Sequence, residues 1–277
     1  MMLVRILVAI CALAAMTSSS HASDAVQLYA AGSLRAALAD AIERFEASSG
    51  DKVQAKFGAS GLLKDEIAGG ARAEVFASAN MEHPKALAEA KRAGPVVLFA
   101  RNKLCALVRP GLEVTSSTLL AWMLDAGVKL GTSTPVADPS GDYAWEVFHK
   151  ADAIKPGAYA TLDKKAQKLI GGPASAPAPA GRTPYGAFIA QGTADIFLTY
   201  CTNALAAQQE NPGQQVIALP DNLAVGADYG LTVVLDASPA AYRFALFILS
   251  PEGQHILADH GFSAPGLVPP ISGALAR

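Results

Sequence analysis

Strand-like and helix-like hydrophobic patterns alternate along most of the chain. Val26 to Ala30 alternates apolar and polar positions as a strand does, and Leu34, Leu38, Ile42 and Phe45 then recur at helical spacing. The same order of strand, tight turn and helix returns further along, which predicts an α/β fold with a largely parallel sheet. The other predicted strands are Lys52 to Phe57, Glu74 to Ser78, Leu104 to Val108, Leu130 to Thr132, Ile196 to Tyr200, Gln215 to Leu219 and Leu231 to Leu235. Helices are predicted at Leu62 to Ala68, Pro84 to Arg92, Thr118 to Leu124, Ala137 to Phe148, Gly186 to Gln191, Ala241 to Leu249 and Pro251 to His260, with another that ends at Ile170.

Three of the strand-to-helix junctions carry a serine. Ser33, Ser60 and Ser140 each lie in a small-residue turn that precedes an apolar-faced helix. A serine at this place either caps its helix or donates to an anion, because unpaired backbone NH groups and the positive end of the helix dipole meet there. In a doubly wound sheet such loops gather at the carboxyl ends of the strands, where ligands bind. Three junctions of one plan favour a shared anion site over three separate caps.

The first 22 residues have the pattern of a secretory signal peptide. Arg5 lies in a short basic start, Ile6 to Met16 is apolar, and Ser20 to Ala22 offers a small-x-small cleavage site. The apolar run is too short to span a bilayer. We therefore predict an exported, periplasmic protein that is cleaved near Ala22 and does not span the membrane.

The charge balance restricts the kind of partner. The chain has 22 basic and 24 acidic residues, a formal net charge of −2, and aromatic residues make up only 7% of it. The absence of a basic stripe, together with the few aromatic residues, argues against nucleic acid. The overall field does not attract anions either, so an anion site in this chain has to use local hydrogen-bond donors.

The predicted mature chain has two cysteines, Cys105 and Cys201. Export permits a disulfide, and a metal site is disfavoured because no histidine lies at ligand spacing from either cysteine. Both residues lie in or follow predicted strands, so they can face each other in one sheet. The residues leave a disulfide and two free thiols as open alternatives.

Patterns typical of enzymes are missing from the sequence. Gly58 and Gly61 do not bracket Ser60 in the G-x-S-x-G spacing of a nucleophile elbow. The histidines on predicted helices have no partnered serine or cysteine, and phosphate-loop, dinucleotide and metal-cluster motifs do not occur. We therefore expect a binding protein without catalytic residues, cofactor or bound metal cation.

Six segments carry a pattern in their order and spacing. They are AAGSL (Ala30 to Leu34), FGASGLLKDEI (Phe57 to Ile67), AEVFASA (Ala73 to Ala79), DPSGDYA (Asp138 to Ala144), IFLTYCTNA (Ile196 to Ala204) and SPEGQHILADHGF (Ser250 to Phe262). Together they resemble the periplasmic molybdate-binding proteins of ABC importers. The resemblance covers nearly the whole predicted mature chain, from about Val26 to Phe262.

The resemblance implies a set of ligand-binding residues. Ser33 and Ser60 would donate hydroxyl and backbone NH bonds to an oxyanion, Ser140 would contribute its backbone NH, and Tyr200 matches the ligand tyrosine of the family. The family's remaining donor falls near Arg182. These residues predict capture of molybdate or tungstate for delivery to an ABC permease, by a protein that is most simply a monomer.

The resemblance also implies a two-lobed fold of the type II periplasmic binding proteins, with a doubly wound, mainly parallel sheet in each lobe. We predict one lobe from residues 24–104 plus 223–277 and the other from residues 105–222. The chain then crosses twice, near Lys103 and near Asp221 to Ala224, and the two crossings form a hinge. The ligand is expected between the lobes.

The chain departs from the family pattern around Arg182. Gly171 to Gly186 is rich in proline and glycine, whereas the family has a plain helix start there, and Pro184 has no NH to donate. Arg182 is either a surface residue or a bidentate partner of the anion. The alternatives are therefore a protein for another oxyanion or a small organic acid held by Arg182, or an exported enzyme acting on a small anion.

Overall fold

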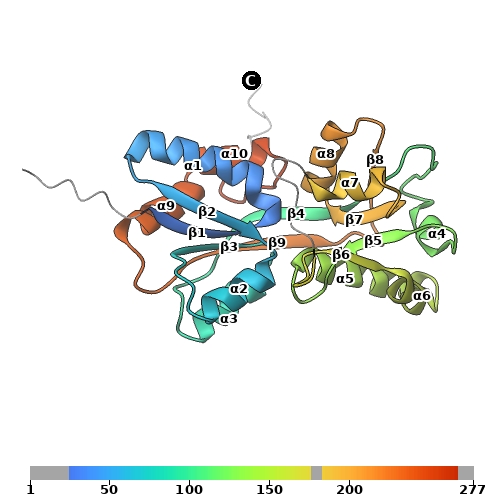
Figure 1. Cartoon of the computed structure of the whole chain (residues 1–277), viewed down its shortest axis with the longest axis horizontal. Helices are drawn as coiled ribbons and strands as arrows, with labels where there is room; N and C mark the ends of the chain where they lie inside the picture. Colours follow the sequence, from blue (N-terminus) through green and yellow to red (C-terminus); the bar gives the residue numbers. More distant parts are fainter. Residues whose placement is uncertain (1–24, 176–182, 268–277) are drawn as a thin grey trace, which may run out of the picture.

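One mixed β-sheet runs the length of the molecule and is divided into two lobes that share the long strand β4 (Figure 1). The computed structural model describes residues 25–175 and 183–267. The strand order is β2-β1-β3-β9-β4-β7-β5-β6, and β8 also pairs with β4. The strands are β1 (Val26–Ala31), β2 (Val53–Gly58), β3 (Val75–Ser78), β4 (Val97–Val108), β5 (Leu130–Ser133), β6 (Gln167–Ile170), β7 (Ile196–Tyr200), β8 (Gln215–Ala218) and β9 (Gly226–Val233).

Helices cover both faces of the sheet. In the first lobe α1, α9 and α10 lie together on one side and α2 and α3 on the other; in the second lobe α7 and α8 lie opposite α5 and α6 (Figure 1). Among the helices of the described residues, none has the length and apolar character needed to cross a bilayer. The helices are α1 (Arg35–Ser49), which follows a 3₁₀ turn (Gly32–Leu34), α2 (Ser60–Ala68), α3 (Glu82–Glu89), α4 (Leu119–Leu124), α5 (Pro139–Ile154), α6 (Ala158–Lys165), α7 (Pro184–Ala190), α8 (Cys201–Glu210), α9 (Pro239–Leu249) and α10 (Pro251–Asp259).

The predicted two-lobed α/β fold is confirmed. We call β1, β2, β3, β9 and the start of β4, with α1, α2, α3, α9 and α10, the first lobe; the other elements form the second lobe. Strand β1 pairs in parallel with β2 and β3, and β5 pairs in parallel with β6 and β7. Strands β4 and β9 run antiparallel to their neighbours. Each lobe thus combines a parallel part with an antiparallel part along the shared strand.

Strand β4 changes partners in its middle. Its residues Val97–Lys103 pair with β9, and Leu104–Val108 pair with β7. The chain returns to the first lobe between β8 and β9, in residues 219–225. Two crossings that lie side by side are the arrangement expected of a hinge. The predicted lobe boundaries stay a prediction, and the change of partner falls between Lys103 and Leu104.

Four segments differ from the expectations. Helix α8 (Cys201–Glu210) was not predicted. Strand β4 begins at Val97 rather than Leu104, β9 begins at Gly226 in a segment expected to be a turn, and β6 takes the place of the helix end before the glycine-rich loop. The extra parts of β4 and β9 pair with each other, and Arg101 Nε donates to the Asp228 carboxylate at 2.8 Å. Such cross-strand pairs stabilise strands whose local pattern is weak, so the sequence pattern missed them.

The two cysteines of the described chain form a disulfide, which settles the alternative left open by the sequence. Cys105 lies in β4, and Cys201 is the first residue of α8. The bridge joins residues 96 positions apart. On the chain-entropy model a loop of this length gives about 4–5 kcal/mol of stabilisation, because the unfolded chain loses freedom.

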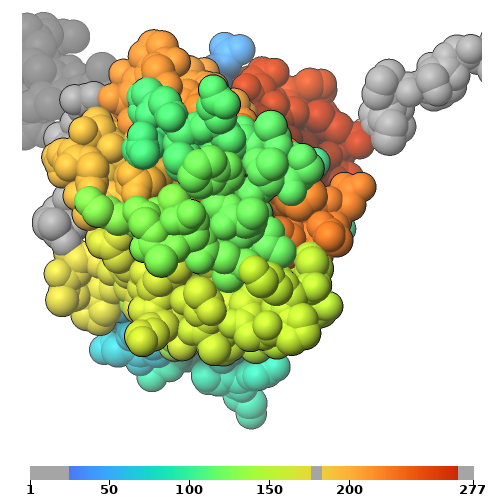
Figure 2. Space-filling view, turned by 90° about the vertical axis from the view of Figure 1, so that its right-hand side faces the viewer, coloured from blue at the N-terminus to red at the C-terminus, as the bar shows by residue number. Residues whose placement is uncertain are grey.

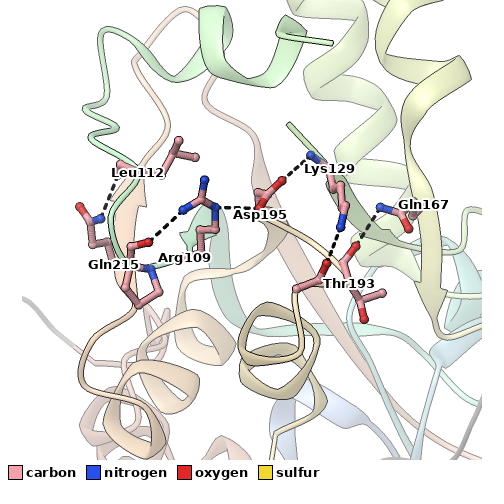
Figure 3. A network of polar contacts seen from close by, with 9 residues as sticks. Arg109, Leu112, Lys129, Gln167, Thr193, Asp195 and Gln215 are labelled. Carbon is pink, nitrogen blue, oxygen red and sulfur yellow. Dashed lines mark hydrogen bonds and ion pairs between the residues drawn. The ribbon is translucent and has the colours of Figure 1, made fainter. Parts of the chain in front are cut away.

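A polar network holds the outer end of the second lobe together (Figure 3). The Asp195 carboxylate accepts from Arg109 Nε at 2.7 Å and from the Lys129 backbone NH at 2.8 Å. Lys129 Nζ donates to the Gly192 carbonyl at 2.8 Å. These residues adjoin the outer ends of β4, β5 and β7, whereas β7 ends at Tyr200 near the first lobe. Figure 2 shows this end of the molecule, covered by green and yellow-green segments of the second lobe.

We expect Asp195→Asn to lower the free energy of unfolding by about 1–3 kcal/mol, because a half-buried carboxylate that accepts two hydrogen bonds becomes a weaker acceptor. Urea denaturation measures this change. The control is Glu113→Gln, an exposed carboxylate in the same lobe, for which a change within about 0.5 kcal/mol is expected. Equal stabilities of the two variants would contradict the prediction.

Candidate functional site

Ser33 lies just after the carboxyl end of β1 and contacts a phenol of β9, two strands away in the same sheet. It lies inside the 3₁₀ turn Gly32–Leu34, and neither this turn nor α1 has a side-chain cap bond at its start, so Ser33 does not cap a helix. Its Oγ lies 2.9 Å from the hydroxyl of Tyr229 in β9. Tyr229 lies in a segment without a clear strand pattern and was not among the predicted site residues.

Ser60 is the first residue of α2 and is 1% exposed. The N-cap residue is Ala59, and α2 has no side-chain cap bond. The Ser60 Oγ instead accepts from the backbone NH of Ala79, just after β3, at 3.1 Å. A hydroxyl that accepts one bond keeps its own proton free to donate. The hydroxyl proton of Ser60 is therefore available for a second hydrogen bond, while its role toward a ligand stays a prediction.

Two tyrosines of the second lobe reach the same Ala79 from the other side. The hydroxyl of Tyr143 in α5 donates to the Ala79 carbonyl at 3.4 Å, and that of Tyr200 does so at 3.5 Å. The Tyr200 ring lies 5.6 Å from the Tyr229 ring. Both hydrogen bonds are long for an O–H donor. A closer acceptor would take either proton readily.

Ser140 supplies a buried hydroxyl from the start of α5. It is 1% exposed, and its Oγ has no hydrogen-bond partner among the described residues. Leaving a buried hydroxyl unpaired costs about 1–3 kcal/mol. The backbone NH of Ser140, expected to be a ligand donor, donates here to Asp138 Oδ1 at 3.0 Å. Tyr143 follows three positions later, on the same helix face.

The phenols of this cluster are neutral at physiological pH. Burial raises the pKa of Tyr200, of Tyr229 and of Tyr143 above the usual value of 10. Each hydroxyl therefore keeps one proton to donate. The hydrogen bonds that these phenols and the serines make within residues 25–175 and 183–267 involve no lysine or arginine. The cluster offers uncharged donors.

Asn102 of β4 is a further polar member that the sequence analysis missed. Its Nδ2 donates to Thr202 Oγ1 at 2.8 Å and lies 3.5 Å from the Tyr229 hydroxyl. Tyr143 could have been predicted from the sequence, because it follows Ser140 at helical spacing and therefore lies on the same helix face. Asn102 and Tyr229 had none, since both lie in the strand segments that the pattern did not reveal.

Arg182 lies outside the described residues, so its role stays a prediction. Two cavities of about 420 and 620 Å³ open on the second lobe, the first beside Thr134 and Lys168, the second beside Arg109 and Gln214. Neither is lined by Ser33, Ser60, Ser140 or Tyr200. In the described part of the chain no cluster of His, Cys, Asp and Glu side chains is able to hold a metal ion.

The lobes also touch at Gly61, next to Ser60. The Gly61 NH donates to the carbonyl of Ala137 in the second lobe at 2.9 Å. A Cβ at Gly61 would lie 2.4 Å from the Val136 oxygen and 2.7 Å from the Ala137 oxygen. Val136 itself has φ 70°, a region that β-branched residues rarely enter, and its NH is held by Asp142 at 2.8 Å. Only a glycine allows this approach of the two backbones.

Comparison with known proteins gives both a family and a fold. The family model of the bacterial extracellular solute-binding proteins matches residues 26–263. The uncharacterized protein PM1146 of Pasteurella multocida is 32% identical over 212 residues, which cover 76% of this chain and 87% of that protein. The molybdate-binding protein ModA of Escherichia coli is 26% identical over 249 residues, which cover 86% of this chain and 88% of ModA.

Solved structures show the same architecture at low sequence identity. The periplasmic molybdate-binding protein of Azotobacter vinelandii has a TM-score of 0.69 and 20% identity, with 88% of this chain and 99% of that chain covered. The sulfate-binding protein SubI of Mycobacterium tuberculosis has a TM-score of 0.70 and 18% identity, with 87% of each chain covered. These similarities confirm the predicted type II periplasmic binding protein fold.

Gly61→Ala should hold the lobes apart, because the added methyl group collides with two backbone oxygens of the second lobe. We expect a larger radius of gyration in small-angle X-ray scattering, with unchanged far-UV circular dichroism. Gly58→Ala is the matched control, since a Cβ there meets only the Leu63 side chain, at 3.5 Å. An unchanged radius for Gly61→Ala would exclude this contact as a steric limit on the approach of the lobes.

Asp138 makes the stability of the folded protein depend on pH. Loss of hydration raises the pKa of its carboxyl from 3.8 to about 6 in the folded protein. Between these values the folded chain holds a proton that the unfolded chain has lost, so this carboxyl's contribution to stability falls as the pH rises from about 4 to about 6. In Asp138→Asn, which keeps a good N-cap, we expect that fall to be absent. The test is to measure the denaturation midpoint of the wild-type protein and of Asp138→Asn at several pH values in this range. A difference between the two midpoints that does not change with pH would contradict the prediction.

Proposed function

The chain belongs to the family of bacterial extracellular solute-binding proteins, and from that premise we propose that it captures the tetrahedral oxyanion molybdate or tungstate between its lobes. The protein then presents the bound anion to the permease of an ABC importer at the outer face of the cytoplasmic membrane. In this proposal the site binds its ligand and carries out no catalysis.

The observation that carries the proposal is the buried, unpartnered hydroxyl of Ser140. It lies on the helix face of Tyr143, whose hydroxyl reaches the Ala79 carbonyl together with that of Tyr200. Ser60 is bound to the NH of the same residue. A ligand with several acceptor oxygens would give Ser140 its missing partner and would join donors from both lobes.

Neutral donors suit this class of ligand. Molybdate and tungstate are fully deprotonated near neutral pH and present only acceptor oxygens, so hydroxyl and NH groups satisfy them without a counter-charge. Hydrogen phosphate keeps a proton and needs an acceptor in its site. The carboxylate of Asp138, two residues before Ser140, already accepts from the Ser140 NH as a helix cap.

Closure of the lobes fits the proposed mode of binding. The long hydrogen bonds of Tyr143 and Tyr200 to Ala79 are weak enough to be exchanged for a ligand oxygen. The Gly61 to Ala137 contact then holds the lobes together beside the ligand. Affinity in this scheme depends on both lobes at once.

The names of the relatives support molybdate as the ligand, and they also indicate which other anions have to be tested as competitors. The ModA protein and the Azotobacter vinelandii protein are described as molybdate-binding, and SubI as sulfate-binding. A small organic acid held by Arg182 is the other alternative that the sequence left open. All three kinds of anion therefore belong in one test.

Isothermal titration of the mature protein with molybdate, tungstate, sulfate, phosphate and a small carboxylate such as lactate tests the function. We expect binding of the first two and weak or no binding of phosphate and lactate; sulfate, which also presents only acceptor oxygens, is the competing oxyanion in this test. The absence of binding heat with both molybdate and tungstate would overturn the proposal, and strong binding of lactate would favour a small organic acid as the ligand.

Ser60→Ala is expected to weaken molybdate binding by about 1–3 kcal/mol, the cost of losing a hydrogen bond to a charged group. The matched control is Ser49→Ala at the surface end of α1, whose hydroxyl bonds only the carbonyl of Phe45 within its own helix end and the NH of Asp51. An affinity of Ser60→Ala equal to that of the control would remove Ser60 from the donor set.

A further inference from the structure

The disulfide lies beside the tyrosine that the proposed function places on the ligand. Tyr200 ends β7, and the next residue, Cys201, starts α8 and is bonded to Cys105 of β4. In the β4–β7 pairing, Leu104 stands opposite Tyr200 and Cys105 opposite Thr199. The covalent bond therefore holds the corner at which the chain turns from strand into helix.

A second link holds the same corner from the other side of Cys201. Asn102, three residues before Cys105 on β4, is 7% exposed, and its Nδ2 donates to Thr202 Oγ1 at 2.8 Å. Tyr200 is itself the N-cap residue of α8, and α8 has no side-chain cap bond. The corner is thus held by β4 through a disulfide and a side-chain hydrogen bond.

The position of this corner decides where the Tyr200 hydroxyl lies. The phenol is a long, rigid side chain, so a small tilt of the backbone at its Cα moves the hydroxyl by a larger distance. Among the described residues that hydroxyl donates a long hydrogen bond, 3.5 Å, to the Ala79 carbonyl, and it also interacts with the Tyr229 side chain. The ring contacts the rings of Tyr143 and Tyr229. The long hydrogen bond to Ala79 is too weak to fix the hydroxyl without support from the backbone.

We propose that the Cys105–Cys201 disulfide is a positioning element of the ligand site, which fixes the β7–α8 corner so that Tyr200 is preorganised for the anion. The inference rests on the proposed function for its ligand. If a side chain is mobile in the free protein and has to be immobilised when the ligand binds, the loss of entropy weakens affinity by about tenfold for each such side chain. Loss of the disulfide should therefore act on affinity as well as on stability.

The test compares the oxidised protein with the double variant Cys105→Ala/Cys201→Ala, by titration with molybdate at a temperature where both are folded. We expect affinity to fall about tenfold, the cost of ordering one side chain. In case the variant folds poorly, the second sample is the oxidised protein after reduction with dithiothreitol. Dithiothreitol is oxidised to its cyclic disulfide as the two cysteine thiols form. Unchanged affinity in the reduced forms would overturn the inference.

A background of Tyr200→Phe separates positioning from a general loss of stability. We expect removal of the disulfide to change affinity by less than about twofold in this background, because the hydroxyl that it positions is absent. Asp195→Asn, at the opposite end of the second lobe (Figure 3), is the control that lowers stability while keeping the affinity. Equal losses with and without the Tyr200 hydroxyl would overturn the inference.

Hydrogen exchange of the peptide that spans residues 196–205 gives a readout without ligand. Faster exchange there in the reduced protein, and not in Asp195→Asn, supports the positioning role, while unchanged exchange overturns it. Oxidised wild-type protein that binds none of the anions would overturn the proposed function alone, because the exchange measurement still decides the role of the disulfide.

Discussion

The backbone NH and carbonyl of Ala79 form a point of contact between the two lobes. Its NH donates to Ser60 within the first lobe, and its carbonyl accepts from Tyr143 and Tyr200 of the second. Ala79 directly follows β3, which is fully buried and paired on both sides, with β1 and β9. The sheet therefore fixes this acceptor rigidly. Phenols carried by the other lobe find it in the same place whenever the lobes come together, so the donor cluster is complete only in that arrangement.

Burial gives the cluster its chemical character. Because loss of water raises the pKa of the phenols, they act as neutral donors beside serine hydroxyls. Such a site distinguishes anions by the number and direction of acceptor oxygens rather than by charge. Loss of water also raises the pKa of Asp138, whose carboxyl accepts a hydrogen bond from the Ser140 NH at the start of α5. Stability, protonation and donor geometry are therefore coupled at one helix end.

Local sequence patterns predicted the elements whose signal lies in neighbouring residues. The alternation in β1, the apolar face of α5, and the helix that begins after Ser250 were all readable, because strand and helix periodicity and helix caps are local properties. The start of β4 and of β9 was missed. These two segments stabilise each other across the sheet, through pairs such as Arg101 with Asp228. For the same reason Tyr229 and Asn102 escaped notice as members of the site.

The sequence by itself determined the α/β architecture and placed Ser33, Ser60, Ser140 and Tyr200 at the ends of strands and the starts of helices, because these features depend on short-range spacing. Only the tertiary structure decided that Ser33 meets a phenol 196 positions away, that Tyr200 reaches a carbonyl 121 positions away, and that the Ser140 hydroxyl has no partner among the described residues. Such contacts depend on how two lobes joined by two crossings close on each other, and local periodicity carries no information about that geometry.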